Sequence, residues 1–462
     1  MHVPKKKPNL LLLDNANDKQ ALINFKYALK STGWKVLVTS RCYPDEYAMV
    51  EVAELSPVEA LKLFRHYYPI DSDLLPTLLD KIYYHTLMIE LIAKAGKKKR
   101  LSIEQLLARL ESGLSHQDLQ RIITVGSHAD SQLKKKQAKL YEYILAMFEP
   151  ADLDASKQTI LRYFSVLPAE DIPLAHLETL FAVEDDNQFE DDLESLFQSG
   201  WLSVKADSYK MHALVQDVVF VKLAVDNANI AELIATLSKI LESESGMILD
   251  LNTAWDFKDY AKTVTEKISV SDTAIGSLNG YLGIFYTNVG QLVNALASTT
   301  QASRHFELCG DTKNLAVSYS RLGNIHQALG EVDKALEFFE LSTELMKELY
   351  ESNPKNESLK NGLAISYEKL GEIHQALGEV DKALEFFELE TDLFKELYES
   401  NPKNVELKNG LAISYYKLGG IYQDKQQAKA MYTQAIALWQ ELYDFTQMET
   451  YKGYIEGTKE LL

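Results

Sequence analysis

The sequence predicts a mainly α-helical protein that opens with a small α/β segment and closes with an α-α superhelix of repeats. Three observations support this prediction. A block of 20 residues in the last third of the chain recurs almost unchanged. The segment between residues 150 and 222 shows the apolar spacing of amphipathic helices. Two short apolar runs near the N-terminus, "NLLLL" and "KVLV", have the character of buried parallel strands.

Composition restricts the class of protein. The chain has 462 residues, enough for about three or four domains, and 46% of them are hydrophobic. The net charge of −19 disfavours nucleic acid and anionic membrane surfaces as partners. Cys42 and Cys309 cannot form a disulfide framework. The chain shows neither a long apolar span nor a signal peptide. We therefore expect a cytoplasmic protein with no nucleic-acid or membrane partner.

Polar residues follow both N-terminal strands. In "PNLLLLDNAND" (8–18), four leucines run directly into Asp14 and Asn15. This is how a buried parallel strand ends when it delivers a carboxylate to a magnesium ion. The second strand, "KVLVTSR" (35–41), ends in polar residues in the same way.

The segment from 135 to 225 is interpreted as a helical domain that closes in a small hairpin. Breaks at Pro168 and Pro173 separate two apolar-periodic segments, and a further helix ends at Gly200 before two strands that flank a turn at 206–208. This is a winged-helix order of elements. Between 150 and 222 there are 14 acidic and 5 basic residues, so we do not expect this domain to bind DNA.

Tandem repeats occupy the last third of the chain. "LGNIHQALGEVDKALEFFEL" (322–341) returns as "LGEIHQALGEVDKALEFFEL" (370–389), and Gly323, Gly371 and Gly419 are spaced by 48 residues. Leu-Gly followed by an aromatic residue or His, then Ala and an aromatic residue, is the tetratricopeptide pattern, whose ordinary period is about 34. We assign the extra residues to a longer second helix and a polar loop, "PKNESLKN" (354–361). At least four helix pairs are predicted.

The first helix of each pair is expected to line a concave face that holds a peptide or protein. Positions −3, +1 and +4 from the Leu-Gly glycine point inward, and they are Ser320, Asn324, Gln327, Glu368, Glu372, Gln375, Tyr416, Gly420 and Gln423. Such a lining suits an extended peptide with basic and hydrogen-bonding groups. The alternative is a solvated groove in a stack that serves only as a spacer. Exchanging Glu368 and Glu372 for lysine is expected to change stability little, as for surface residues.

The order of the segments resembles the STAND class of signal-transduction ATPases, in the NB-ARC arrangement of plant resistance proteins, the apoptotic protease-activating factor and many bacterial sensors. Besides the two strands, the resemblance depends on "AELSPVEALKLF", "YYHTLMIELIAKAG", "YKMHALVQDV" and the repeats, so it covers nearly the whole chain. It implies a truncated nucleotide-binding remnant (1–50), a helical ARC-like domain (51–130), a winged-helix domain (131–225) and a tetratricopeptide-repeat superhelix (226–462).

The resemblance implies remnants of a nucleotide site at Asp14, Asn15, Thr39, Ser40, Arg41, Thr86 and His212. Asp14 matches the Walker B aspartate, Arg41 the sensor arginine, and His212 the histidine of the MHD motif. Thr86 replaces the proline that packs on adenine, and Ala213 replaces the aspartate of MHD. Taken singly, Asp14 could cap a strand, Arg41 could pair on the surface, and His212 could be a core histidine.

The phosphate loop of these ATPases, G-x-x-x-x-G-K-[ST], does not occur in the sequence. We therefore expect the chain to begin partway through a nucleotide-binding domain, to lack ATPase activity alone and to carry no cofactor. Asp14 would hold magnesium only if a phosphate loop were supplied elsewhere. The resemblance implies ATP or ADP, magnesium and oligomerisation for a complete homologue. Three functions remain: a signalling protein with an incomplete nucleotide switch, a repeat scaffold, and the disfavoured transcription regulator.

Overall fold

The computed structural model divides the chain into two compact units, Met1–Ile89 and Glu90–Leu462, and each is described by itself. The described residues are mainly helical, as predicted. They are 10–13, 19–29, 34–39, 48, 54–111, 150, 153–183, 186–244 and 246–462. Of the helices in these ranges, none is long and apolar enough to cross a lipid bilayer.

The first unit contains a short β-α-β segment. Strand β1 (Leu10–Leu13) pairs in parallel with β2 (Lys35–Val38), and helix α1 (Lys19–Leu29) lies between them in the chain. Both predicted strands are therefore present. The expectation that they are buried is wrong, because Leu10 and Leu12 are 64% and 60% exposed. In a two-stranded sheet, alternate side chains point to opposite faces, and here one of these faces is open to solvent.

Four helices follow. They are α2 (Pro57–Tyr67), α3 (Leu75–Lys81), α4 (Thr86–Lys99), in which the boundary between the two units falls, and α5 (Ile103–Glu111). Helix α2 begins with a capping box. The Ser56 hydroxyl accepts a hydrogen bond from the Glu59 backbone N–H (3.3 Å), and the Glu59 carboxylate accepts one from the Ser56 N–H (3.2 Å). Pro57 occupies the first helical position, where no backbone N–H is required.

Residues 153–183 and 186–222 form a helical region with a small three-stranded sheet. Its elements are α8 (Ala155–Val166), β3 (Ile172–Pro173), α9 (Leu174–Leu180), α10 (Asp186–Gln198), β4 (Ser203–Lys205), β5 (Ser208–Lys210) and α11 (Ala213–Lys222). The sheet is antiparallel, with strand order β3-β5-β4. Gly200 follows α10 with a φ of +84°, and the predicted hairpin comes next. Buried Gln216 ties α11 to α8, because its amide donates to the carbonyls of Phe164 (2.8 Å) and Leu167 (2.9 Å).

A connecting segment that the sequence analysis did not specify precedes the clear repeats. It consists of α12 (Ala231–Ile240), a minimal hairpin of β6 (Ser243–Glu244) and β7 (Met247–Ile248), and α13 (Leu251–Lys267). The Asn288 side chain fixes the hairpin. Its amide nitrogen donates to the Gly246 carbonyl (3.0 Å), and its oxygen accepts from the Ile248 N–H (2.9 Å).

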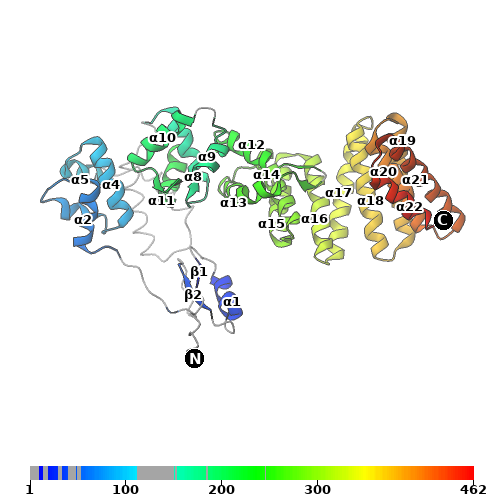
Figure 1. The fold of residues 1–462 in the computed structure, drawn as a ribbon, viewed down its shortest axis with the longest axis horizontal. Helices are drawn as coiled ribbons and strands as arrows, with labels where there is room; N and C mark the ends of the chain where they lie inside the picture. Colours follow the sequence, from blue (N-terminus) through cyan, green and yellow to red (C-terminus); the bar gives the residue numbers. More distant parts are fainter. Residues whose placement is uncertain are drawn as a thin grey trace, which may run out of the picture. The chain divides into compact units, whose positions relative to one another are not determined.

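The repeats form a row of antiparallel helices, each packed against the next (Figure 1). The pairs are α14 (Thr273–Asn288) with α15 (Leu292–Cys309), α16 (Thr312–Ala328) with α17 (Val332–Ser352), α18 (Glu357–Ala376) with α19 (Val380–Ser400), and α20 (Val405–Ile421) with α21 (Lys425–Thr446). Helix α22 (Glu449–Lys459) follows. The prediction of at least four helix pairs is therefore confirmed.

The repeat glycines lie where the two helices of a pair meet. A Cβ atom added to Gly371 would lie 2.5 Å from the ring of Phe387, and Gly323 has the same relation to Phe339. The extra residues of the long period extend the helices. Helices α17 and α19 have 21 residues each, and α18 already begins at Glu357. The predicted polar loop is therefore shorter than expected, because Asn356 caps α18 by accepting from the Leu359 N–H (3.2 Å).

Candidate partner-binding face of the repeats

The residues predicted to line the concave face come from α16, α18 and α20. Asn324, Gln375 and Tyr416 are exposed, and Ser320, Gln327, Glu368 and Glu372 are half-buried. Gln423 is also exposed, but it lies in the turn after α20. Helix α20 ends at Ile421, whereas α16 and α18 continue to the alanine after the corresponding glutamine. Gln423 is therefore not at the helical position that the 48-residue spacing predicted.

Glu368 and Glu372 are paired within the protein. Lys417 of the following repeat donates to the carboxylates of both, at 2.8 Å for Glu372, and Lys369 lies 2.8 Å from the other oxygen of Glu372. Burial works against the charged form, yet hydrogen bonds from Lys369 and Lys417 hold the pKa of Glu372 below its ordinary value. The expectation that these glutamates behave as surface groups is therefore wrong, because the pairs with Lys417 join α18 to α20.

Glu390 of α19 lies beside these pairs and is almost fully buried, with 1% exposure. Burial raises the pKa of its carboxyl from 4.5 to about 8, so the neutral acid predominates at pH 7. The Ser414 hydroxyl lies 3.0 Å from both the Gly410 carbonyl and Glu390 Oε1. A hydroxyl has one proton. A protonated Glu390 can donate to Ser414 while Ser414 donates to Gly410, and Glu390 Oε2 then remains buried without a partner.

Glu368, Glu372 and Glu390 form an acidic cluster around Lys417, and all three stand at positions where the two near-identical copies differ. Three exchanges between the copies each introduce a carboxyl group: Ser320 becomes Glu368, Asn324 becomes Glu372, and Ser342 becomes Glu390. All three carboxyl groups interact with Lys417. Sequence reasoning did not identify Glu390 and Lys417 as members of this cluster. A position-by-position comparison of the copies would have identified Glu390, because of the three exchanges between α17 and α19 it alone introduces a carboxyl group.

Tyr416 extends the same face into an aromatic cluster. It is 41% exposed, and its ring lies 5.7 Å from that of Tyr432 and 5.9 Å from that of Trp439. The Trp439 indole N–H donates to the Asn409 side chain (3.0 Å), which fixes its orientation. Tyr454 of α22 packs on the Trp439 ring at 5.1 Å. Tyr416 is therefore an exposed aromatic side chain on a rigid support, as found at protein-binding hot spots.

The expected nucleotide-site remnants are only partly described. Asp14, Asn15, Ser40 and Arg41 lie outside the described residues. Thr39 follows β2, and its backbone N–H donates to the Leu13 carbonyl (2.8 Å). Thr86 is the exposed first residue of α4. Within the described ranges, no group of three or more His, Cys, Asp or Glu residues is placed to hold a metal ion.

His212 has a local structural role. It precedes α11 as the N-cap residue, is exposed, and accepts a hydrogen bond through Nδ1 from the Leu214 N–H (3.2 Å). The prediction that it contacts a diphosphate stays a prediction.

A sequence profile described as tetratricopeptide repeat matches residues 274–348, which span α14 to most of α17. The C-terminal region of the chain therefore carries tetratricopeptide repeats, a class of helical repeat that commonly mediates binding between proteins. No curated protein matches the sequence.

Several solved structures resemble parts of the chain. BtubC (BKLC) from P. vanneervenii is 18% identical, with 46% of this chain and 81% of that chain covered and a TM-score of 0.37. A STAND protein with a tetratricopeptide repeat sensor from Pyrococcus horikoshii is 14% identical, with 97% and 71% covered and a TM-score of 0.31. Rap protein complexed with competence and sporulation factor is 12% identical, with 83% and 98% covered and a TM-score of 0.30. TM-scores this low do not indicate a shared function.

Proposed function

We propose that the chain binds an extended peptide segment of a protein partner along the concave face of its repeats. The observation that carries this proposal is the exposure of Asn324, Gln375 and Tyr416, which stand at positions predicted to face inward on three successive first helices. Each carboxamide both donates and accepts, so it can meet main-chain N–H and C=O groups of an extended peptide. Tyr416 supplies a rigid aromatic contact.

Charge has a smaller role in this proposal than the sequence suggested. Lys369 and Lys417 already compensate Glu368 and Glu372, so a basic partner would have to compete with two internal cations. Burial raises the pKa of Glu390 to about 8, so its carboxyl is mostly protonated at pH 7 and adds little charge. The partner is therefore recognised chiefly through hydrogen bonds and the aromatic contact.

The test is a selection of phage-displayed random peptides on the full chain, followed by calorimetry of one selected peptide. The variant Asn324→Ala, Gln375→Ala, Tyr416→Ala is expected to bind it at least about tenfold more weakly, because truncation of a few central residues removes most binding energy. The matched control exchanges three exposed residues of α21: Gln427→Ala, Gln434→Ala and Phe445→Ala. The control should bind like the wild type. Equal binding by all three proteins, or no selected peptide, would overturn the proposal.

As a second candidate, we propose a regulatory protein of the STAND NB-ARC type with an incomplete nucleotide switch, acting in the cytoplasm. The parallel β1-α1-β2 segment and the element order from α8 to α11 support it, because they follow the domain order of that class. The described residues do not fit a nucleotide, since the chain contains no phosphate loop and His212 Nδ1 already accepts the Leu214 N–H. We therefore expect calorimetry with ATP or ADP and magnesium to show weak binding or none. Micromolar affinity with magnesium-dependent turnover would contradict this.

A further inference from the structure

In the two near-identical repeats, a phenylalanine ring from the second helix packs on the side of the first helix that faces it. In the pair α16–α17, the Phe338 ring stacks on His326 with centroids 5.3 Å apart and planes 6° apart, and it lies 5.9 Å from the Tyr319 ring. The next copy reproduces this group with Phe386, His374 and Tyr367, at 5.4 Å and 6.1 Å. Three rings therefore fill this space in each copy.

The first pair, α14–α15, lacks two of these three rings. With Gly283 aligned on Gly323, Asn279 stands at the tyrosine position and Ser298 at the phenylalanine position. Tyr286 keeps a ring at the histidine position. The two exchanges remove most of the ring volume, although the helices remain packed on each other.

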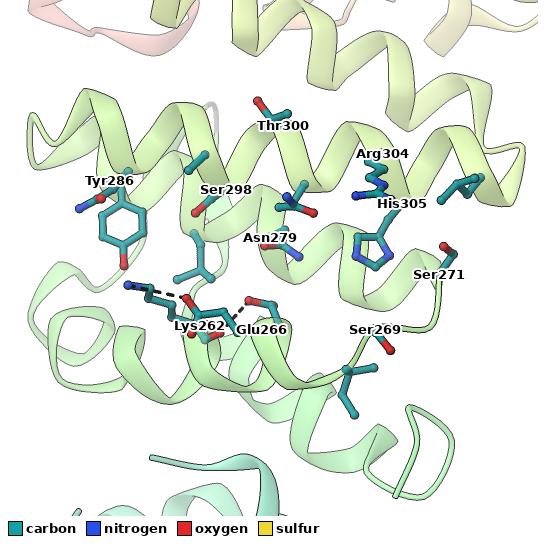
Figure 2. A pocket seen from close by; sticks show the side chains of 17 residues that line it. Lys262, Glu266, Ser269, Ser271, Asn279, Tyr286, Ser298, Thr300, Arg304 and His305 are labelled. Carbon is teal, nitrogen blue, oxygen red and sulfur yellow. Dashed lines mark hydrogen bonds and ion pairs between the residues drawn. The ribbon is translucent and has the colours of Figure 1, made fainter. Parts of the chain in front are cut away.

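A pocket of about 770 Å³ opens at this place. Its floor is α14, and α13 and α15 form its walls (Figure 2). Figure 2 shows Tyr286, Ser298 and Asn279 along one side and Lys262 and Glu266 of α13 on the opposite side. A volume of this size lies within the range of small-ligand sites.

The buried polar residues that line the pocket are uncharged. Asn279 is 4% exposed, and its amide nitrogen donates to the Ile275 carbonyl (3.1 Å). Burial lowers the pKa of His305, whose Nδ1 accepts from the Asp272 N–H (3.3 Å), so this ring is neutral at pH 7. Lys262 and Glu266 lie 3.8 Å apart with more than half of each side chain exposed. Arg304 of α15, which also lines the pocket, is exposed as well, so the charged side chains stand at the rim. This environment favours an uncharged ring flanked by amide groups over an ionic ligand.

We propose that this pocket receives an aromatic side chain from a protein partner, in the space that Phe338 occupies in the next repeat. The site is separate from the concave face and does not depend on the function proposed above. At about 100° per residue, the α14 positions that form the pocket floor lie about 130° around the helix from the inner positions. The aromatic contact is the part of the Tyr286 ring that reaches the pocket, since this residue is 5% exposed. The half-buried Ser298 and the buried Asn279 side chains offer hydrogen bonds to the flanking peptide groups.

The test uses N-acetyl-L-phenylalaninamide and N-acetyl-L-leucinamide, titrated into the full chain and followed by saturation-transfer difference NMR. The aromatic amide is expected to bind about 2- to 10-fold more tightly, because ring stacking adds to the burial of apolar surface. Ser298→Phe restores the ring of the other repeats and should abolish the difference, as should Asn279→Tyr. Equal affinity for the two amides, or an unchanged preference in both variants, would overturn the proposal.

Two further variants test where on the protein the aromatic amide binds. Phe338→Ser opens the equivalent space in the next repeat, so the aromatic amide should gain a second site. Because Phe338 is only half-buried, this exchange spares the core. The concave-face variant Asn324→Ala, Gln375→Ala, Tyr416→Ala should keep the preference for the aromatic amide. If that variant loses it, the amide binds at the concave face and the pocket assignment is wrong. Thermal unfolding of each variant verifies that it is folded.

Discussion

Glu390 places an ionisable group where the preceding copy of the repeat has a serine. The Ser342 hydroxyl donates a hydrogen bond to the Ala316 carbonyl (2.8 Å). Burial of Glu390 instead raises the pKa of its carboxyl to about 8, so that the protonated form is favoured. Its interactions with Lys417 and Ser414 connect α19 to α20. The stability of this part of the stack therefore depends on pH.

The first prediction concerns this carboxyl group. Its pKa is about 8 in the folded chain and close to 4.5 in the unfolded chain, so the folded state binds more protons between these values. The free energy of unfolding should therefore fall as pH rises from about 5 to 9, by roughly 2–4 kcal/mol. Glu390→Gln should remove this part of the slope. The slope is measured by urea unfolding at three pH values. The proteins used retain Trp439 as the only tryptophan. Glu344→Gln, an exposed exchange on α17, serves as control.

If wild type and Glu390→Gln show the same slope of stability against pH, the neutral state assigned to Glu390 is wrong. The Glu344 control should retain the wild-type slope, because it leaves the buried Glu390 carboxyl and its contact with Ser414 in place.

The second prediction compares two helical glycines. Gly371→Ala places a Cβ 2.5 Å from the Phe387 ring, so overpacking should lower the free energy of unfolding by about 1–3 kcal/mol. Gly453 lies inside α22 with no atom within 4 Å of an added Cβ. Gly453→Ala should therefore raise stability by about 0.5–1 kcal/mol, through helix propensity alone. Calorimetric unfolding distinguishes the two, and a destabilised Gly453→Ala with an unaffected Gly371→Ala would contradict the packing argument.

The repeats differ in how the first helix of each pair ends. Helices α16 and α18 end before Gly330 and Gly378, whose φ values are +78° and +77°. In both turns a glutamate accepts from the preceding histidine and the following lysine, as Glu379 does from His374 (2.7 Å) and Lys382 (2.9 Å). The last pair lacks such a glycine, and Tyr422 is extended after α20. The turn after α20 has three residues fewer than the turns of the two preceding repeats, and Gln423 therefore lies outside the helix.

The third prediction concerns the N-terminal strands. Among the residues that the structure describes, the sheet of β1 and β2 has two strands, and Leu10, Leu12 and Leu37 are all more than half exposed. Small open sheets are marginally stable, so local opening should need little free energy. Hydrogen exchange followed by mass spectrometry should show β1 and β2 exchanging within seconds to minutes, while α18 and α19 remain protected for hours. Slow exchange throughout β1 and β2 in a monomeric sample would contradict this.

At the scale of the whole molecule, the chain joins segments whose contacts are largely local. In the repeat region each helix packs on its sequence neighbours, so stability is approximately a sum of nearest-neighbour terms. The four tryptophans of the sequence stand in different segments. Trp201 follows α10, and Trp439 lies in α21. Their fluorescence therefore reports on different parts of the chain.

The fourth prediction is that unfolding is not all-or-none. Variants that retain only Trp201 or only Trp439, with the other tryptophans replaced by phenylalanine, should give urea transitions with different midpoints, because long modular chains lose cooperativity. Far-ultraviolet circular dichroism should then show a broader transition than either tryptophan. Coincident midpoints for both variants and for circular dichroism would show that the chain unfolds as one cooperative unit.

The sequence by itself determined the repeat class, the pairing of the helices and the small residues at their contacts, because these depend on local periodicity and on residue size at fixed spacing. It also predicted both N-terminal strands and the hairpin after Gly200. The tertiary structure alone decided that Glu368 and Glu372 are paired with Lys417, that Glu390 is buried, and that a pocket opens beside Asn279. The physical reason is that these features depend on side chains from neighbouring helices. Burial, ion pairing and pocket volume are properties of that packing and cannot be obtained from spacing along one helix.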